Sequence, residues 1–136
     1  MGAKFRGRKT KGQNRWVEGS LLSFSDDTRQ ICEQDCTSTQ LIRHWVISKT
    51  VGQYTGLKDK NGTEIFAGDI VSFGDDNFEI VFADACFWIR KVRDIHYVRE
   101  LHATIGMGPD VILGQCGVEV IGNIHDNPEL LKVNDG

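Results

Sequence analysis

Short apolar runs separated by turn-forming residues recur along most of the chain. The runs Ile70–Phe73, Phe78–Phe82 and Cys86–Val92 are rich in branched and aromatic residues, and acidic or glycine-containing turns separate them. Alternating apolar positions at this spacing are typical of half-buried strands joined by hairpins. The pattern predicts a mainly β fold, built around a small SH3-like or open β-barrel.

Additional N-terminal strands are expected before this region. The segment Arg15–Phe24 mixes aromatic, branched and leucine residues around Gly19, which predicts a strand with a bend or bulge. Thr28–Glu33 and Gln40–Ser48 are two further predicted strands, joined by a polar loop. A helix across 27–36 is the competing interpretation of this part of the chain.

The connection 50–62 is the most distinctive of the predicted loops. It contains three glycines and two lysines, and it closes with Asn61-Gly62, a strong turn signal. Tyr54 and Leu57 are large apolar groups that would be exposed on such a loop unless a partner covered them. We therefore expect Tyr54 and Leu57 to lie at an interface between subunits.

The C-terminal third gives weaker signals. The segment 94–101 is ambiguous between helix and strand, 104–109 is a glycine-rich loop, and 118–124 is a predicted closing strand. Asn127 can cap a helix, and Pro128 suits the first helical position because its missing N–H costs nothing there. A short C-terminal helix is therefore expected.

Length and composition fit one soluble domain. The 136 residues, 40% of them hydrophobic, can bury an ordinary core. We expect residues 1–14 to form a basic arm or an edge strand and residues 15–136 to form a single β domain, with a sub-boundary near 50–62. No run approaches the ~20 apolar residues of a membrane span, and the N-terminal residues lack the apolar region of a signal peptide, so a cytoplasmic protein without membrane contact is expected.

The charges are distributed unevenly. Residues 1–15 carry six basic side chains and no acid, whereas the remaining residues carry ten basic and nineteen acidic side chains, a net charge of −9. Such a basic start could contact nucleic-acid phosphates through Arg6, Arg8, Lys9 and Lys11. Aromatic residues such as Trp16 or Trp88 could then stack on the bases of a single strand. The alternatives are a solvated basic edge and tryptophans packed in the core.

The residues that could carry catalysis or bind metal do not form a recognisable motif. In a cytoplasmic chain the cysteines should be reduced, and Cys32 and Cys36 lack a second Cys/His pair at zinc-site spacing. The closest histidines, His96 and His102, have neither helical nor strand spacing for one shared face. We expect no catalytic residue, metal, cofactor or small-molecule substrate.

Two long motifs resemble the YopX-like family of small proteins encoded by phages and prophages. The first is TVGQYTGLKDKNGTEIFAGDIV at 50–71 and the second is EVIGNIHDNPELL at 119–131. A weaker likeness is RWVEGSLL at 15–22, and the segment 93–117 is less typical of the family. The motifs occur in the family's order and, with the N-terminal segments, the likeness covers most of the chain.

This resemblance implies a small-barrel architecture and self-association into symmetric or segment-exchanged homo-oligomers in a bacterial host. It brings no assigned activity, so no catalytic residue is carried over. The resulting expectation is a phage-encoded, non-catalytic oligomeric interaction or assembly protein. The alternative is a nucleic-acid-binding module that uses the basic N-terminal segment.

Overall fold

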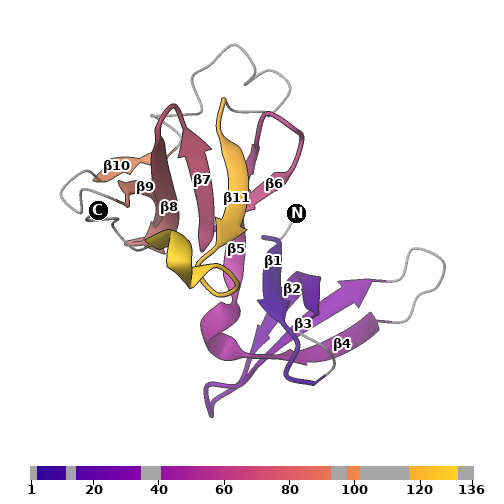
Figure 1. The fold of residues 1–136 in the computed structure, drawn as a ribbon. Helices are drawn as coiled ribbons and strands as arrows, with labels where there is room; N and C mark the ends of the chain where they lie inside the picture. Colours follow the sequence, from indigo (N-terminus) through magenta and orange to yellow (C-terminus); the bar gives the residue numbers. More distant parts are fainter. Residues whose placement is uncertain (1–2, 12–14, 35–40, 93–97, 102–116, 132–136) are drawn as a thin grey trace. The chain divides into compact units, whose positions relative to one another are not determined.

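The computed structural model describes residues 3–11, 15–34, 41–92, 98–101 and 117–131. The chain divides into two compact units, Met1–Tyr54 and Thr55–Gly136, and strands dominate both (Figure 1). The division falls within strand β5 (Gly52–Lys58), inside the segment where the sequence predicts a sub-boundary. The mainly β class is confirmed, but the described strands form antiparallel sheets and not a closed barrel.

The first unit is built from β1 (Phe5–Arg8), β2 (Trp16–Ser23), β3 (Arg29–Gln34) and β4 (Leu41–Val46), in the order β4-β3-β2-β1, with the start of β5 beside β1. The strands predicted over 15–24, 28–33 and 40–48 are confirmed. The competing helix over 27–36 is wrong for 29–34, because these residues form strand β3. The side chain of Ile31 in this strand is buried in the core.

Within the predicted arm or edge strand of residues 1–14, the structure places Phe5–Arg8 in strand β1, between β2 and β5. It pairs with β2, where Arg8 lies opposite Trp16, and with β5, where Arg6 lies opposite Gly52. Gly7 makes the close approach possible, because a Cβ atom there would lie 3.0 Å from the Cβ of Val46. Arg6 and Arg8 therefore belong to a strand in the interior of a sheet.

The sheet of the first unit curls so that the ends of β1 and β4 meet. The N–H of Thr10 donates to the carbonyl of Trp45 at 3.0 Å, and the N–H of Ile47 donates to the carbonyl of Arg8 at 2.8 Å. The concave side holds the core, in which Phe5, Leu21 and Val51 pack against the buried residues Val17, Ile31 and Val46. The convex side carries mainly polar, basic and aromatic side chains.

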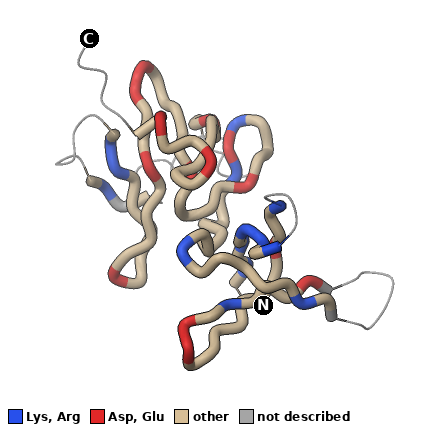
Figure 2. The backbone as a smooth tube through the Cα atoms, turned by 60° about the horizontal axis from the view of Figure 1, so that its bottom comes forward, with Lys and Arg blue, Asp and Glu red and all other residues tan. Residues whose placement is uncertain are grey.

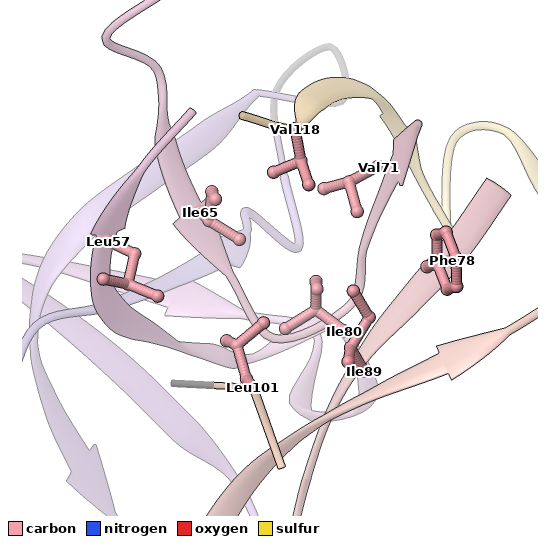
Figure 3. Close-up of a cluster of buried hydrophobic side chains, with 8 residues drawn as sticks. All are labelled: Leu57, Ile65, Val71, Phe78, Ile80, Ile89, Leu101 and Val118. Carbon is pink, nitrogen blue, oxygen red and sulfur yellow. The ribbon is translucent and has the colours of Figure 1, made fainter. Parts of the chain in front are cut away.

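The second unit contains β6 (Glu64–Phe66), β7 (Asp69–Phe73), β8 (Asp76–Ala83), β9 (Cys86–Lys91), β10 (Val98–Glu100) and β11 (Glu119–Asn123). Its main sheet has the order β10-β9-β8-β7-β11, and the end of β5 pairs with β6. Figure 3 shows the core of this unit, which consists of Leu57, Ile65, Val71, Phe78, Ile80, Ile89, Leu101 and Val118. The strands predicted over 70–73, 78–82, 86–92 and 118–124 are confirmed.

The predicted loop 50–62 is mostly strand, and this is the main correction to the fold. Its glycines and polar residues are typical of a loop and led to the wrong prediction. In the structure, Thr55 is buried and its hydroxyl donates to the carbonyl of Ile65 at 2.7 Å. Only the end of the segment turns, around Asn61-Gly62. Asp59, 1% exposed, organises this turn by accepting hydrogen bonds from the N–H groups of Asn61 and Thr63.

The C-terminal helix is shorter than expected. Residues Pro128–Leu131 form a single 3₁₀ turn, in which the N–H of Leu130 donates to the carbonyl of Asn127. The predicted loop 104–109 lies outside the described residues. In the part of the chain that the structure describes, no helix is long and apolar enough to cross a membrane.

Candidate nucleic-acid interface

The alternation of β1 separates its apolar side from its basic side. Successive strand residues point to opposite faces, so Phe5 and Gly7 lie on the core side while Arg6 and Arg8 lie on the convex side. Lys4 precedes the strand in the same alternation, and its carbonyl accepts a hydrogen bond from Tyr54 of β5. The three cationic side chains of Lys4, Arg6 and Arg8 therefore occupy every second position along the chain, on one side of the sheet.

Aromatic rings flank these cations. The guanidinium carbons of Arg6 and Arg8 lie 5.0 and 5.3 Å from the ring centroid of Trp16, and the Lys4 ammonium lies 5.6 Å from that of Tyr54. These separations suit cation–π attraction. We call the set Lys4, Arg6, Arg8, Trp16 and Tyr54 the basic–aromatic face.

The guanidinium groups of this face are held in place. Nε and Nη2 of Arg6 and Nε of Arg8 are buried atoms, and both side chains are half-buried overall. The acidic residue beside them is Glu18, whose carboxylate lies 3.3 Å from the Lys4 ammonium. Because Arg6 and Arg8 belong to a paired strand, a ligand that reaches the exposed part of their side chains would not have to order a loose arm.

The charge of the chain divides between the two units. Met1–Tyr54 contains nine Lys and Arg against five Asp and Glu, a net charge of +4, whereas Thr55–Gly136 contains seven against fourteen, a net charge of −7. Figure 2 marks these basic and acidic positions along the described backbone. An anionic polymer is therefore attracted by the first unit and repelled by the second.

The four basic residues predicted as contacts do not act as one group. Arg6 and Arg8 lie together beside Trp16. Lys9 lies on the other face of the sheet, and its backbone forms a β-bridge with that of Val46. Lys11 is exposed beyond the end of β1. The sequence analysis missed Lys4, although its spacing of two from Arg6 on a strand was the available signal.

The predicted subunit-interface pair is divided by the structure. Leu57 is 8% exposed and packs in the core of its own unit, so the expectation that it lies exposed on a loop is wrong. Tyr54 is half-buried on the basic–aromatic face. Self-association through this segment stays a prediction, and Leu57 cannot contribute to it without leaving the core.

The second unit contains a concave surface. A cleft of about 280 Å³ is lined by Val81, Ala83, Asp84, Trp88, Arg90 and Val98. The indole N–H of Trp88 donates to the carbonyl of Ala83 at 2.9 Å, and Arg90 forms an ion pair with Glu79. Because its cation is paired within the acidic unit, this cleft is a poorer site for an anionic ligand than the basic–aromatic face.

The candidate metal ligands are only partly described. His44 lies 2.8 Å from a carboxylate oxygen of Glu33, and Cys32 is half-buried. Cys36, His96 and His102 lie outside the described residues. Over the described ranges, no group of three or more His, Cys, Asp or Glu side chains is arranged to hold a metal ion.

Comparison with known proteins shows the family of this chain and a similar solved structure. The model of the family described as YopX protein matches residues 4–132, which spans both units. The crystal structure of protein EF1440 from Enterococcus faecalis is similar, with 27% sequence identity and a TM-score of 0.54. That similarity covers 96% of this chain and 98% of the other. No curated protein matches the sequence significantly.

Proposed function

This chain belongs to the YopX protein family, and from that premise we propose that it is a non-catalytic binding protein whose first unit binds single-stranded nucleic acid. The observation that carries the proposal is the basic–aromatic face. Lys4, Arg6 and Arg8 point to one side of a curled sheet, and Trp16 lies against two of them. Family membership itself brings no activity, so the argument depends on these residues.

The spacing of the cations suits an extended polyanion. Two residues of a strand rise about 6.6 Å, so the line from Lys4 to Arg8 offers a positive group at regular short intervals. Arg and Lys neutralise phosphates and release their condensed counterions, which favours binding at low salt. The second unit, with its net charge of −7, should keep the affinity modest.

The aromatic groups favour a single strand over a duplex. Bases can stack on aromatic side chains or on guanidinium planes only where they are not already paired and stacked. Trp16 and the two guanidinium groups near its ring provide such flat groups on the convex side of the sheet. A duplex would present mainly its phosphates to the same residues.

A salt titration tests the proposal. Fluorescence anisotropy of a labelled dT oligonucleotide should report binding at low salt. If Lys4, Arg6 and Arg8 each neutralise one phosphate, log K should fall against log salt with a slope of about −2. Failure of the unmodified protein to bind at low salt would refute the proposed function.

Matched variants place the binding. Lys4→Gln with Arg8→Gln should weaken binding and make the slope shallower, while circular dichroism shows an intact fold. Lys58→Gln with Lys60→Gln removes the same charge from exposed residues of the second unit and should leave affinity nearly unchanged. An equal loss of affinity in the two double variants would mean that net charge, and not this face, determines binding.

A further inference from the structure

A second pair of aromatic rings is exposed on the first unit. Phe24 and Trp45 are 42% and 50% exposed, and their ring centroids lie 5.5 Å apart at an interplanar angle of 40°. Aromatic rings gain much of their stabilising energy from burial. Two large rings held together in solvent therefore form a surface that a flat ligand can cover.

A well-formed turn fixes Phe24 beside Trp45. The N–H of Phe24 donates to the carbonyl of Thr28 at 3.0 Å, and the carbonyl of Phe24 accepts from Asp27 at 3.1 Å. The hydroxyl and the N–H of Thr28 both donate to Asp26, at 2.5 and 3.2 Å, and these bonds lower the pKa of that carboxyl. Phe24 is therefore anchored at the base of a closed turn.

The register places Trp45 on the same side of the sheet as the basic–aromatic face. Trp45 lies opposite Gln30, which lies opposite Leu22, and Leu22 shares the alternation of Trp16 along β2. At the other side, Trp45 is joined to Thr10 and Ile47 is joined to Arg8 by backbone hydrogen bonds. Trp45 and Trp16 therefore flank the end of β1 from its two sides.

Cations accompany this second aromatic pair as well. Arg43 is exposed and lies two residues before Trp45, in the same alternation of β4. Arg8 lies on the strand between Trp45 and Trp16. Asp26 and Asp27 in the turn beside Phe24 repel phosphate, so the phosphate contacts of a nucleic-acid occupant would come from Arg8 and Arg43.

We propose that Phe24 and Trp45 form a second base-stacking surface, so that one single strand crosses from Trp16 over Arg8 to Trp45. The inference rests on the proposed function, because the cations of the basic–aromatic face supply the phosphate contacts. It adds a requirement for the ligand, which must offer at least two unpaired bases, one on each side of the phosphate that contacts Arg8. Every base has a flat face, so DNA and RNA single strands are both accepted.

The test compares the double variant Phe24→Ser/Trp45→Ser with the unmodified protein. The probes are a dT oligonucleotide, a U oligonucleotide of equal length and a DNA duplex. Loss of one stacked base should weaken binding of both single strands about tenfold. The salt slope and the duplex affinity should stay unchanged, because stacking neutralises no phosphate. Trp45→Phe keeps a ring and should retain most of the affinity.

The controls separate this inference from the proposed function. Phe73→Ser removes a 56%-exposed ring from the second unit and should change no affinity. Should the double variant fail to fold, Phe24→Ser and Trp45→Phe carry the comparison. Unchanged single-strand binding by a folded variant lacking a ring would overturn the inference and leave the proposed function standing. An equal loss for duplex and single strands would also overturn it, whereas no binding by the unmodified protein would refute both proposals.

Discussion

Glu18 is the acidic side chain within the cationic line of the first unit. It lies opposite Arg6 in the register of β1 and β2, and its carboxylate is 3.3 Å from the Lys4 ammonium. Both side chains are substantially exposed, so the pair contributes little to stability. The same carboxylate also acts on a bound polyanion, because it cancels one positive charge and repels phosphate directly.

Replacing this acid should therefore improve binding. We predict that Glu18→Gln tightens single-strand binding at low salt by up to about fivefold, since exposed charge interactions are worth roughly 0.2–1 kcal/mol. The salt slope should steepen because Lys4 becomes available to phosphate. Glu129→Gln, an exposed acid of the second unit, is the control. A weaker or unchanged affinity in Glu18→Gln would show that Lys4 takes no part in binding.

At the scale of elements, one buried carboxylate joins the turn after β5 to strand β11. Asp59 accepts hydrogen bonds from the N–H groups of Asn61 and Thr63 at 2.8 Å, and its other oxygen accepts from the N–H of Val120 at 2.9 Å. The motif KDKNG, which contains this residue, is therefore explained by structure: its aspartate satisfies three backbone donors from two distant segments.

Removing this carboxylate should destabilise the second unit strongly. We predict that Asp59→Ala lowers the free energy of unfolding by about 3 kcal/mol or more, because three N–H groups lose a charged acceptor. Asp59→Asn keeps one acceptor oxygen and should fall between Ala and the unmodified protein. Urea denaturation measures the effect, with the exposed turn residue Asp75 changed to Ala for comparison. Equal stability of Asp59→Ala and Asp75→Ala would contradict this role.

The strands that the sequence revealed are those with clear alternation. Cys86–Lys91 and Glu119–Asn123 were foreseeable because branched and aromatic residues recur between turns. Strand β5 was not, since Gly52 and Gly56 resemble loop residues and the burial of Thr55 depends on a bond to distant Ile65. Local composition carries no information about such a non-local partner.

The candidate site was foreseeable only in part, for the same reason. The basic character of residues 4–11 is visible in the sequence, but its interpretation as an arm ignored that Phe5 and Gly7 supply an apolar side. The meeting of Arg8 with Trp16 and of Thr10 with Trp45 depends on strand register. Register is fixed by packing across the whole sheet, so these neighbours could not be derived from spacing alone.

At the scale of the whole molecule, the charge separation confines the proposed binding to one unit. The first unit carries +4 and all of the basic–aromatic face, while the second carries −7. The three tryptophans sample this division, because Trp16 and Trp45 belong to the first unit and Trp88 lines the cleft of the second. Each indole N–H is thus a local reporter of where a ligand lies.

The most direct test of the account is a nuclear magnetic resonance titration of the ¹⁵N-labelled protein with a dT oligonucleotide at low salt, observed at the indole N–H signals. We predict that the signals of Trp16 and Trp45 shift together and saturably, while that of Trp88, which donates to the carbonyl of Ala83, stays in place. A shift of Trp88 alone, or saturable binding that moves neither Trp16 nor Trp45, would contradict the proposal that the first unit binds nucleic acid through this face.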